Sequence, residues 1–376
     1  MTITKKETVK KTPVKKKVVE DKVEGMFDAL KAKIHKNVKG AHCEVMSEST
    51  IAKVESWVSM PSYDLNRIIS GKLDVGMPEK SLMLLVGQEH TFKSSMMVKM
   101  AKQALDDGFK PVIIDTEGGI SGEFAARWGL DLDRVLYSYT CWAEEAKGIL
   151  AQIKESGEQK FCIIIDSMGG LDKLKSYNDA LGGEYKQDMG GVARILKSTL
   201  KLLVNIIKSQ NSIGIISSHF YSSSGSVPMP DSVVGGKALL LLPDIILYLK
   251  KAGKADTERA KIDKRVNIIS IKNRFYPAGK LGYVDIDYVN GINEFTGMME
   301  IAIESGVIDQ RASYYFYKGE KIGQGLVNSV EIILQNKTLK SNILKDINKY
   351  LTTTGFSNEV DEHLSKDLKD LQEQIG

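Results

Sequence analysis

The sequence of 376 residues has few cysteines and no long uninterrupted hydrophobic run. Its three cysteines, Cys43, Cys141 and Cys162, share no spacing typical of a metal site, so we expect reduced thiols in a cytoplasmic protein. No apolar stretch reaches the ~18 residues that a membrane span needs. The charged N-terminus is followed by no apolar segment, so we also expect neither a signal peptide nor a membrane partner.

A strong charge of one sign is also lacking from most of the chain. The formal net charge is +4, but residues 1–22 contain eight Lys against Glu7, Glu20 and Asp21, so the remainder is nearly neutral. Bulk charge therefore gives no reason to expect nucleic-acid binding by the folded part. We expect residues 1–25 to be a disordered basic tail, either merely solvated or acting as an auxiliary DNA-binding arm.

The apolar pattern divides the remaining chain into three parts. Residues 26–38 carry a narrow apolar stripe at helical spacing, so we expect the segment 26–61 to pack on something outside itself, as a subunit-interaction segment. Residues 298–376 have a helical pattern and an acidic end, which predicts a small α-rich C-terminal lobe with an acidic tail.

Residues 62–297 predict an α/β core. Short runs rich in Ile and Val are typical of strands buried on both faces, and they occur at residues 82–86, 111–115, 161–166, 213–217, 245–249 and 266–271. Helical patterns at residues 95–107, 143–156 and 192–210 separate the first four. This alternation predicts a mostly parallel sheet flanked by helices, with ligands at the carboxyl ends of the strands.

A phosphate-binding loop is predicted directly after the first of these strands. A strand, a loop and a helix in this order aim backbone N–H groups at a phosphate, while Lys93 reaches the β- and γ-oxygens and Ser94 can ligate magnesium. Phe92 stands where the usual pattern has its second glycine, so the spacing alone leaves a degenerate loop open. The candidate nucleotide-binding residues are Gly87, Gln88, Glu89, His90, Thr91, Phe92, Lys93, Ser94 and Ser95.

Three further strands end in polar side chains. Asp166 follows a buried run and is placed to support a magnesium ion near Ser94. Glu117 follows another run and could polarise an attacking water, and His219 ends a third and could sense the γ-phosphate. Each alone is also compatible with an ordinary turn or core residue. Together they predict one nucleotide site at the carboxyl edge of the sheet.

At this point the sequence resembles a known family, the RecA recombinases of bacteria and their phage relatives of the UvsX kind. The resemblance runs in order from Ser62 to Leu351. Phe92 and His219 are similar to the phage proteins rather than to bacterial RecA. The segments that carry the resemblance are 126–131 (ARWGLD) with Glu117, 189–194 (MGGVAR), 235–239 (GGKAL), 272–274 (KNR) and 317–325 (YKGEKIGQG).

The resemblance implies roles for residues at the nucleotide site. Lys93 and Ser94 would bind phosphate and magnesium, Asp166 would support the metal, Glu117 would activate water and His219 would be the γ-phosphate sensor. Phe124 matches an aromatic residue that stacks on adenine, whereas Ser121 replaces an Asp of the family. Lys272 and Arg274 would reach the ATP of the neighbouring protomer.

The resemblance also implies DNA-binding loops at about residues 171–191 and 220–234. From sequence alone, both segments are also compatible with ordinary mobile surface loops. In the family they line the filament axis, where Arg194 and Lys201 would contact phosphates and Met189 would wedge between bases. The other implied DNA-binding residues are Gly190, Gly191, Gly235, Gly236 and Lys237.

The sequence therefore predicts an ATP- and Mg²⁺-dependent strand-exchange recombinase that forms a homo-oligomeric filament on single-stranded DNA and pairs it with homologous duplex. Single-strand-binding and loader proteins are further expected partners. Two alternatives stay open here. One is a hexameric helicase-type motor of the same fold, which would lack residues 317–325 and 272–274. The other is a recombination mediator that does not hydrolyse ATP.

Overall fold

The computed structural model describes residues 14–39, 41, 43–49, 51–182, 189–219, 238–253, 262–288 and 291–354. The chain divides into two units, Met1–Lys53 and Val54–Gly376. In the first unit, helix α1 spans Val14–Asn37, and Lys31 pairs with Asp28 and Glu48. The expectation of disorder is therefore wrong for residues 14–25, where Lys and Glu favour a helix and no Gly or Pro precedes Gly25.

A nine-stranded sheet forms the centre of the second unit, with the order β11-β10-β9-β8-β3-β7-β6-β4-β5. All neighbours from β8 to β5 are parallel, whereas β8 to β11 pair in antiparallel fashion. This confirms the mostly parallel α/β core. The strands are β3 Ser81–Gly87, β4 Lys110–Asp115, β5 Leu136–Tyr139, β6 Phe161–Asp166, β7 Ile213–His219, β8 Ile245–Lys251, β9 Lys264–Asn273, β10 Leu281–Asp287 and β11 Gly291–Ile292.

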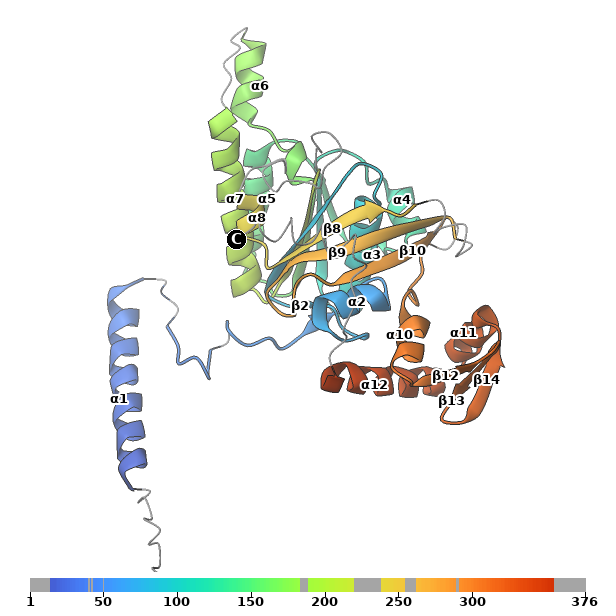
Figure 1. Ribbon diagram of the computed structural model, residues 1–376. Helices are drawn as coiled ribbons and strands as arrows, with labels where there is room; N and C mark the ends of the chain where they lie inside the picture. The colour runs from blue at the N-terminus through green and yellow to red at the C-terminus, as the bar shows by residue number, and fades with distance from the viewer. Residues whose placement is uncertain are drawn as a thin grey trace, which may run out of the picture. The chain divides into compact units, whose positions relative to one another are not determined.

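Helices connect these strands and cover both faces of the sheet (Figure 1). Two short strands, β1 Trp57–Val58 and β2 Met77–Pro78, form a separate antiparallel pair. The helices are α2 Tyr63–Ser70, α3 Lys93–Asp106, α4 Gly122–Arg127, α5 Ala143–Ser156, α6 Leu174–Leu181, α7 Met189–Ser209 and α8 Ala238–Leu241, with 3-10 turns at Leu132–Arg134 and Met168–Gly170.

The core has two layers because side chains of a strand alternate between the faces of the sheet. Met83 and Leu85 of β3 pack with α3 on one face, whereas Leu82, Leu84 and Val86 pack with α5 and α7 on the other. Strands buried on both sides carry no polar alternation. This explains why their sequences are continuous apolar runs, and it leaves the strand ends as the places for polar groups.

Helix α6 corrects the prediction of a mobile loop over residues 171–191. Leu174, Tyr177 and Leu181 recur at helical spacing without an intervening Gly or Pro, and Gly182 follows the helix. The ring of Tyr177 lies 5.1 Å from that of Trp142, between centroids. Residues 183–188, and all of the predicted second loop at 220–234, lie outside the described residues.

The C-terminal region is less helical than predicted. It contains helices α10 Met298–Glu304, α11 Leu326–Gln335 and α12 Lys337–Thr354, but also a three-stranded antiparallel sheet of β12 Ile308–Arg311, β13 Tyr314–Tyr317 and β14 Glu320–Gln324. Four successive aromatic residues make β13 a good strand, and a two-residue turn follows it. Lys318 and Gly319 have φ of 50° and 83°, the conformation that a tight hairpin requires.

No helix in the described part of the chain is long and apolar enough to cross a membrane. The predicted acidic tail begins beyond Thr354 and is not among the residues that the structure describes.

Candidate nucleotide site

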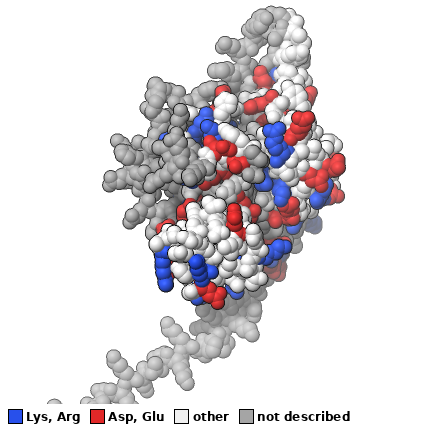
Figure 2. Space-filling model, turned by 90° about the vertical axis from the view of Figure 1, so that its right-hand side faces the viewer, with Lys and Arg blue, Asp and Glu red and all other residues white. Residues whose placement is uncertain are grey.

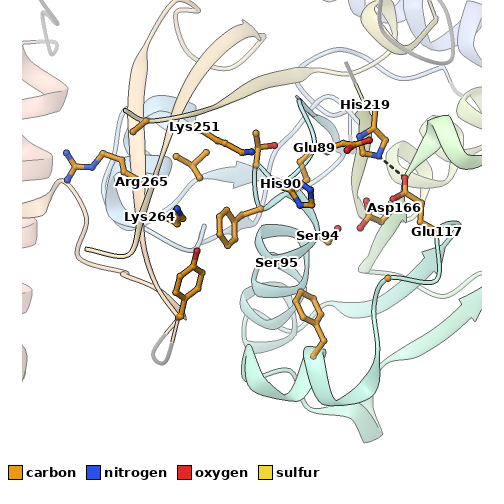
Figure 3. A pocket seen from close by; sticks show the side chains of 18 residues that line it. Glu89, His90, Ser94, Ser95, Glu117, Asp166, His219, Lys251, Lys264 and Arg265 are labelled. Atoms are coloured by element: carbon orange, nitrogen blue, oxygen red, sulfur yellow. Dashed lines mark hydrogen bonds and ion pairs between the residues drawn. The ribbon is translucent and has the colours of Figure 1, made fainter. Parts of the chain in front are cut away.

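Four parallel strands bring their carboxyl ends to one edge of the sheet. The register pairs Gly87 with His219 and Asp115 with Asp166, so the polar residues that follow these strands are neighbours. A cavity of about 830 Å³ lies at this edge (Figure 3). The predicted site residues that line it are Glu89, His90, Thr91, Phe92, Lys93, Ser94, Ser95, Glu117, Phe124, Asp166 and His219.

The predicted phosphate-binding loop has two non-glycine residues in the left-handed backbone conformation. Phe92 precedes α3 with φ 61°, in the left-handed region that favours glycine, and His90 has φ 58°. Gly87 is required by close packing, because a Cβ there would lie 2.7 Å from the Leu249 carbonyl oxygen and 2.8 Å from Thr91 Oγ1. Phe92 therefore occupies, at a conformational cost, a backbone position that glycine would adopt freely.

Lys93 is buried at the start of α3. Its Nζ donates hydrogen bonds to the carbonyl oxygens of Gly87 (3.0 Å) and Gln88 (2.9 Å). Burial lowers the pKa of Lys93, and the nearby carboxylates of Asp166, Glu117 and Glu89 oppose this shift. A buried ammonium that faces a polar cavity is a ready partner for a phosphate anion.

Asp166 is buried at the end of β6, with its carboxylate in the cavity. Burial raises its pKa, hydrogen bonds from Ser217 and Ser94 oppose the shift, and the charges of Glu117 and Asp115 add to it. Ser217 Oγ donates to Asp166 Oδ1 at 2.5 Å. Ser94 and Asp166, the pair that the sequence predicts for magnesium, are thus within hydrogen-bonding distance of each other.

Glu117 and His219 meet across the strand ends. Glu117 Oε1 accepts a hydrogen bond from Ser167 Oγ at 2.6 Å and lies 2.9 Å from His219 Nε2 (Figure 3). The other ring nitrogen of His219, Nδ1, is buried and has no hydrogen-bond partner among the described residues. The carboxylate is thus held in a fixed orientation at the cavity wall, with its second oxygen available to a substrate.

Asp115 fixes the loop that carries Glu117, a role that sequence reasoning missed. Its buried carboxylate accepts hydrogen bonds from the backbone N–H groups of Glu117 (3.0 Å), Gly118 (2.8 Å) and Ile120 (2.9 Å). The hydroxyl of Tyr137 donates a fourth at 3.1 Å. A carboxylate directly after a strand and two residues before Glu117 was a usable signal for such a turn.

Three aromatic side chains border the cavity. Phe124 of α4 packs on Trp128, with 6.2 Å between the ring centroids, and Phe92 lies 6.4 Å from Tyr288. Ser121, at the position that departs from the family, caps α4 by accepting a hydrogen bond from the Phe124 N–H at 3.1 Å. Ser121 thus has a structural role here, since Ser and Asp are both favoured at such caps.

Lys251 and Lys264 also line the cavity, and neither was predicted. Strand β8 runs parallel to β3 with Leu249 opposite Gly87, which places Lys251 just beyond the start of the phosphate-binding loop. Figure 3 shows Lys251 extending toward this loop, whereas Arg265 points away from it. Arg265 is held by both carboxylate oxygens of Asp285, at 2.6 and 2.9 Å.

The two cations that the resemblance assigns to a neighbouring protomer lie outside this cavity. Lys272 Nζ donates to the carbonyl oxygens of Leu240 (3.2 Å) and Leu241 (2.8 Å) at the end of α8. Arg274 Nη1 pairs with Asp244 Oδ1 at 2.9 Å. Neither cation contributes to the cavity of its own subunit.

The predicted DNA-binding residues are only partly described. Arg194 and Lys201 are exposed and seven residues apart on α7, so they share one face of the helix. Met189 and Gly190 form the first turn of α7 and Gly191 is buried, whereas Gly235, Gly236 and Lys237 lie outside the described residues. On the face shown in Figure 2, the described Lys and Arg are interspersed with Asp and Glu.

The chemistry of the cavity fits a nucleoside triphosphate with a divalent cation. The start of the 14-residue helix α3, the buried ammonium of Lys93 and a Gly87 whose Cβ the fold would exclude provide a phosphate cradle. Among the described residues no group of three or more His, Cys, Asp or Glu could hold a metal. Ser94 and Asp166 suit magnesium, which keeps several waters and takes other ligands from phosphate.

Comparisons with known proteins identify the family of the chain. Residues 24–293 match the RecA N-terminal domain and residues 296–352 match the RecA C-terminal domain. The second match includes residues 317–325, which a hexameric helicase would lack.

Among similar proteins, Protein RecA of Lactobacillus delbrueckii subsp. bulgaricus is 25% identical over 337 residues, 89% of this chain and 99% of that protein. Protein RecA of Acinetobacter baumannii is 24% identical over 286 residues, 76% of this chain and 81% of that protein. The chain therefore belongs to the RecA family and is a DNA-dependent ATPase of the strand-exchange recombinase type.

Proposed function

We propose that the chain forms a helical filament on single-stranded DNA in which each ATP lies between the phosphate-binding loop of one subunit and Lys272 and Arg274 of the next. The observation that carries this proposal is that the predicted cations of the site lie in two separate places. Lys93 and the polar strand ends share one cavity, while Lys272 and Arg274 lie outside it. Phosphoryl transfer commonly needs a further cation, supplied in cis or in trans.

Within a subunit, Lys93 and the backbone N–H groups of residues 88–93 hold the phosphates, and Ser94 and Asp166 hold Mg²⁺. The Mg²⁺ held by these two residues would supply positive charge beside the phosphates. Glu117, oriented by Ser167 and by the Asp115 turn, accepts the proton of the attacking water. Phe124, with Tyr288 beside Phe92, borders the base.

We assign coupling between nucleotide and DNA to His219. This residue contacts Glu117 and immediately precedes the segment 220–234, which the resemblance assigns to DNA binding. The segments near α7 and after β7 then grip single-stranded DNA by its backbone, with Arg194 and Lys201 on phosphates and Met189 between bases. Homology is read by base pairing with the incoming duplex rather than by the protein.

We assign residues 26–61 to contact with a neighbouring subunit. Met26, Phe27 and Leu30 of α1 are exposed although they are apolar, as a helix that packs on a partner requires. We also place the chain nearer to the phage recombinases than to bacterial RecA, on Phe92 at the loop glycine and on the His219 position. The 24–25% identity to bacterial proteins is compatible with a separate branch.

Mixing two inactive variants tests the shared site. Lys93→Ala subunits lack the ammonium group that binds phosphate in their own cavity, and Arg274→Ala subunits lack the guanidinium group offered to the next subunit. Each variant alone should therefore lose most DNA-stimulated phosphate release. When they co-assemble, interfaces that pair an intact loop with an intact Arg274 should restore part of the activity. Absence of rescue at every mixing ratio, with co-assembly shown by crosslinking, would mean that Arg274 acts within its own subunit or not at all.

A further inference from the structure

Asp244 is a buried carboxylate that contacts the proposed interface cation directly. It precedes β8, and its side chain is 4% exposed. Its Oδ1 pairs with Arg274 Nη1 at 2.9 Å, and its backbone carbonyl accepts a hydrogen bond from the Arg274 N–H at 3.1 Å. Asp244 therefore holds Arg274 by both the backbone and the side chain.

The other carboxylate oxygen anchors Asp244 itself. Asp244 Oδ2 accepts hydrogen bonds from the N–H of Leu82 at 3.1 Å and from Lys208 Nζ at 3.2 Å. Leu82 lies near the start of β3, the strand that leads into the phosphate-binding loop. The Asp244 carboxylate is thus fixed to the central sheet, and a fixed acceptor restricts the rotamers of the side chain that it binds.

Arg274 can still contact a phosphate while it is paired with Asp244. Its side chain is 55% exposed, in contrast to Asp244, and only Nη1 takes part in the ion pair. A guanidinium group has five N–H donors in a rigid plane, so donors remain for a phosphate. Lys272 differs, because its Nζ donates to two carbonyl oxygens at the end of α8.

We propose that Asp244 is a positioning residue, which holds the Arg274 guanidinium in the orientation that reaches the nucleotide of the neighbouring subunit. This inference rests on the proposed function, in which Arg274 acts across the interface. A long arginine side chain that is free to rotate would spend little time in a productive geometry, so the carboxylate raises the hydrolysis rate by orienting the cation in advance.

The test compares the effect of Asp244→Asn when it is placed in one or the other of the two subunits of the mixing experiment. Asp244→Asn is added either to the Lys93→Ala subunit, which supplies Arg274 to its neighbour, or to the Arg274→Ala subunit, which supplies only the phosphate-binding loop. In the first mixture the rescued rate of DNA-stimulated phosphate release should fall by roughly tenfold or more. In the second mixture it should not change, because no Arg274 is present in that subunit for Asp244 to orient.

A merely structural role of Asp244 would lower the rescued rate in both mixtures, which would overturn the inference. A higher rate in the first mixture would also overturn it, because Asp244 would then restrain Arg274 rather than orient it. Failure of the unmodified pair to show rescue would instead contradict the shared site itself, so the two failures are distinguishable.

Two further variants guard against a folding artefact. Lys208→Met removes one of the two groups that anchor Asp244 Oδ2, so it should lower the rescued rate less than Asp244→Asn does, and only in the subunit that supplies Arg274. If thermal unfolding shows that Asp244→Asn does not fold, Asp244→Glu takes its place. It keeps the charge but displaces the carboxylate by one methylene, so the same dependence on subunit is expected.

Discussion

Glu117 Oε1 lies 2.9 Å from His219 Nε2, which joins the proposed catalytic carboxylate to the last residue of β7. Replacing Glu117 with Gln removes the base but keeps a side chain of the same size beside the phosphate cradle. We expect Glu117→Gln to bind ATP and assemble on DNA while phosphate release falls by roughly 10²- to 10⁴-fold. Glu123→Gln, an exposed carboxylate on α4, is the matched control. Hydrolysis by Glu117→Gln at the wild-type rate would remove Glu117 from this role.

Asp166 predicts a pH dependence of stability in the protein without nucleotide. Its pKa is raised above the unfolded value by burial, so the folded state favours the protonated carboxyl. The contribution of Asp166 to stability is therefore full below the unfolded pKa and is lost as the pH rises through the folded pKa. Asp166→Asn, which stays neutral, should raise the Tm at pH 8, with the difference shrinking toward pH 4. An equal or lower Tm of the variant at pH 8 would contradict this assignment.

Replacing Arg194 tests the proposed contact between this residue and the phosphates of single-stranded DNA. A phosphate contact carries no base information, so Arg194→Ala should weaken binding to single-stranded DNA similarly for all sequences and reduce the salt slope by about one. Lys102→Ala, on α3, changes the same charge on the opposite face of the sheet and should leave the slope as it is. Titrations over a salt series measure both quantities, and an unchanged slope for Arg194→Ala would exclude this residue from the interface.

Lys251 is expected to act as a second cation of the subunit's own nucleotide cavity. We expect the Lys251 side chain to contact the bound ATP rather than only the γ-phosphate that is transferred. Its removal should therefore weaken the binding of ATP in the ground state and in the transition state alike. Lys251→Ala should therefore raise the KM for ATP roughly tenfold, the effect of one charge-assisted hydrogen bond, with kcat nearly unchanged. The adjacent Lys250→Ala is the control. A loss confined to kcat would instead place Lys251 on the transferred phosphate.

Continuous apolar runs made the parallel strands predictable from sequence. Strands buried on both faces admit no polar residue before their ends, so residues 82–86 and 161–166 were recognisable. Asp166 at the end of one strand, and Lys93 and Glu117 beyond the ends of two others, were recognisable for the same reason. Strand β5 was missed because it is a short edge strand with exposed side chains and no such run. The hairpin of β13 and β14 was missed because its tight turn depends on the positive φ of Lys318 as well as of Gly319.

The parts of the site that the sequence did not predict depend on the order of the strands in the sheet. Lys251 enters the cavity because β8 is the parallel neighbour of β3, although the two strands are far apart in the chain. Asp244 meets Arg274 because β8 and β9 pair in antiparallel fashion with Ile245 opposite Asn273. Periodicity identifies elements but does not order them in a sheet, so such partners emerge only from the tertiary structure.

Electron cryo-microscopy of the protein with single-stranded DNA and a slowly hydrolysed ATP analogue tests the central claim most directly. The account predicts an extended helical filament. Each nucleotide would lie between the Lys93 loop of one subunit and Arg274 of the next, with Arg274 still paired to Asp244. Closed rings, or a filament in which Arg274 lies remote from every nucleotide, would contradict it.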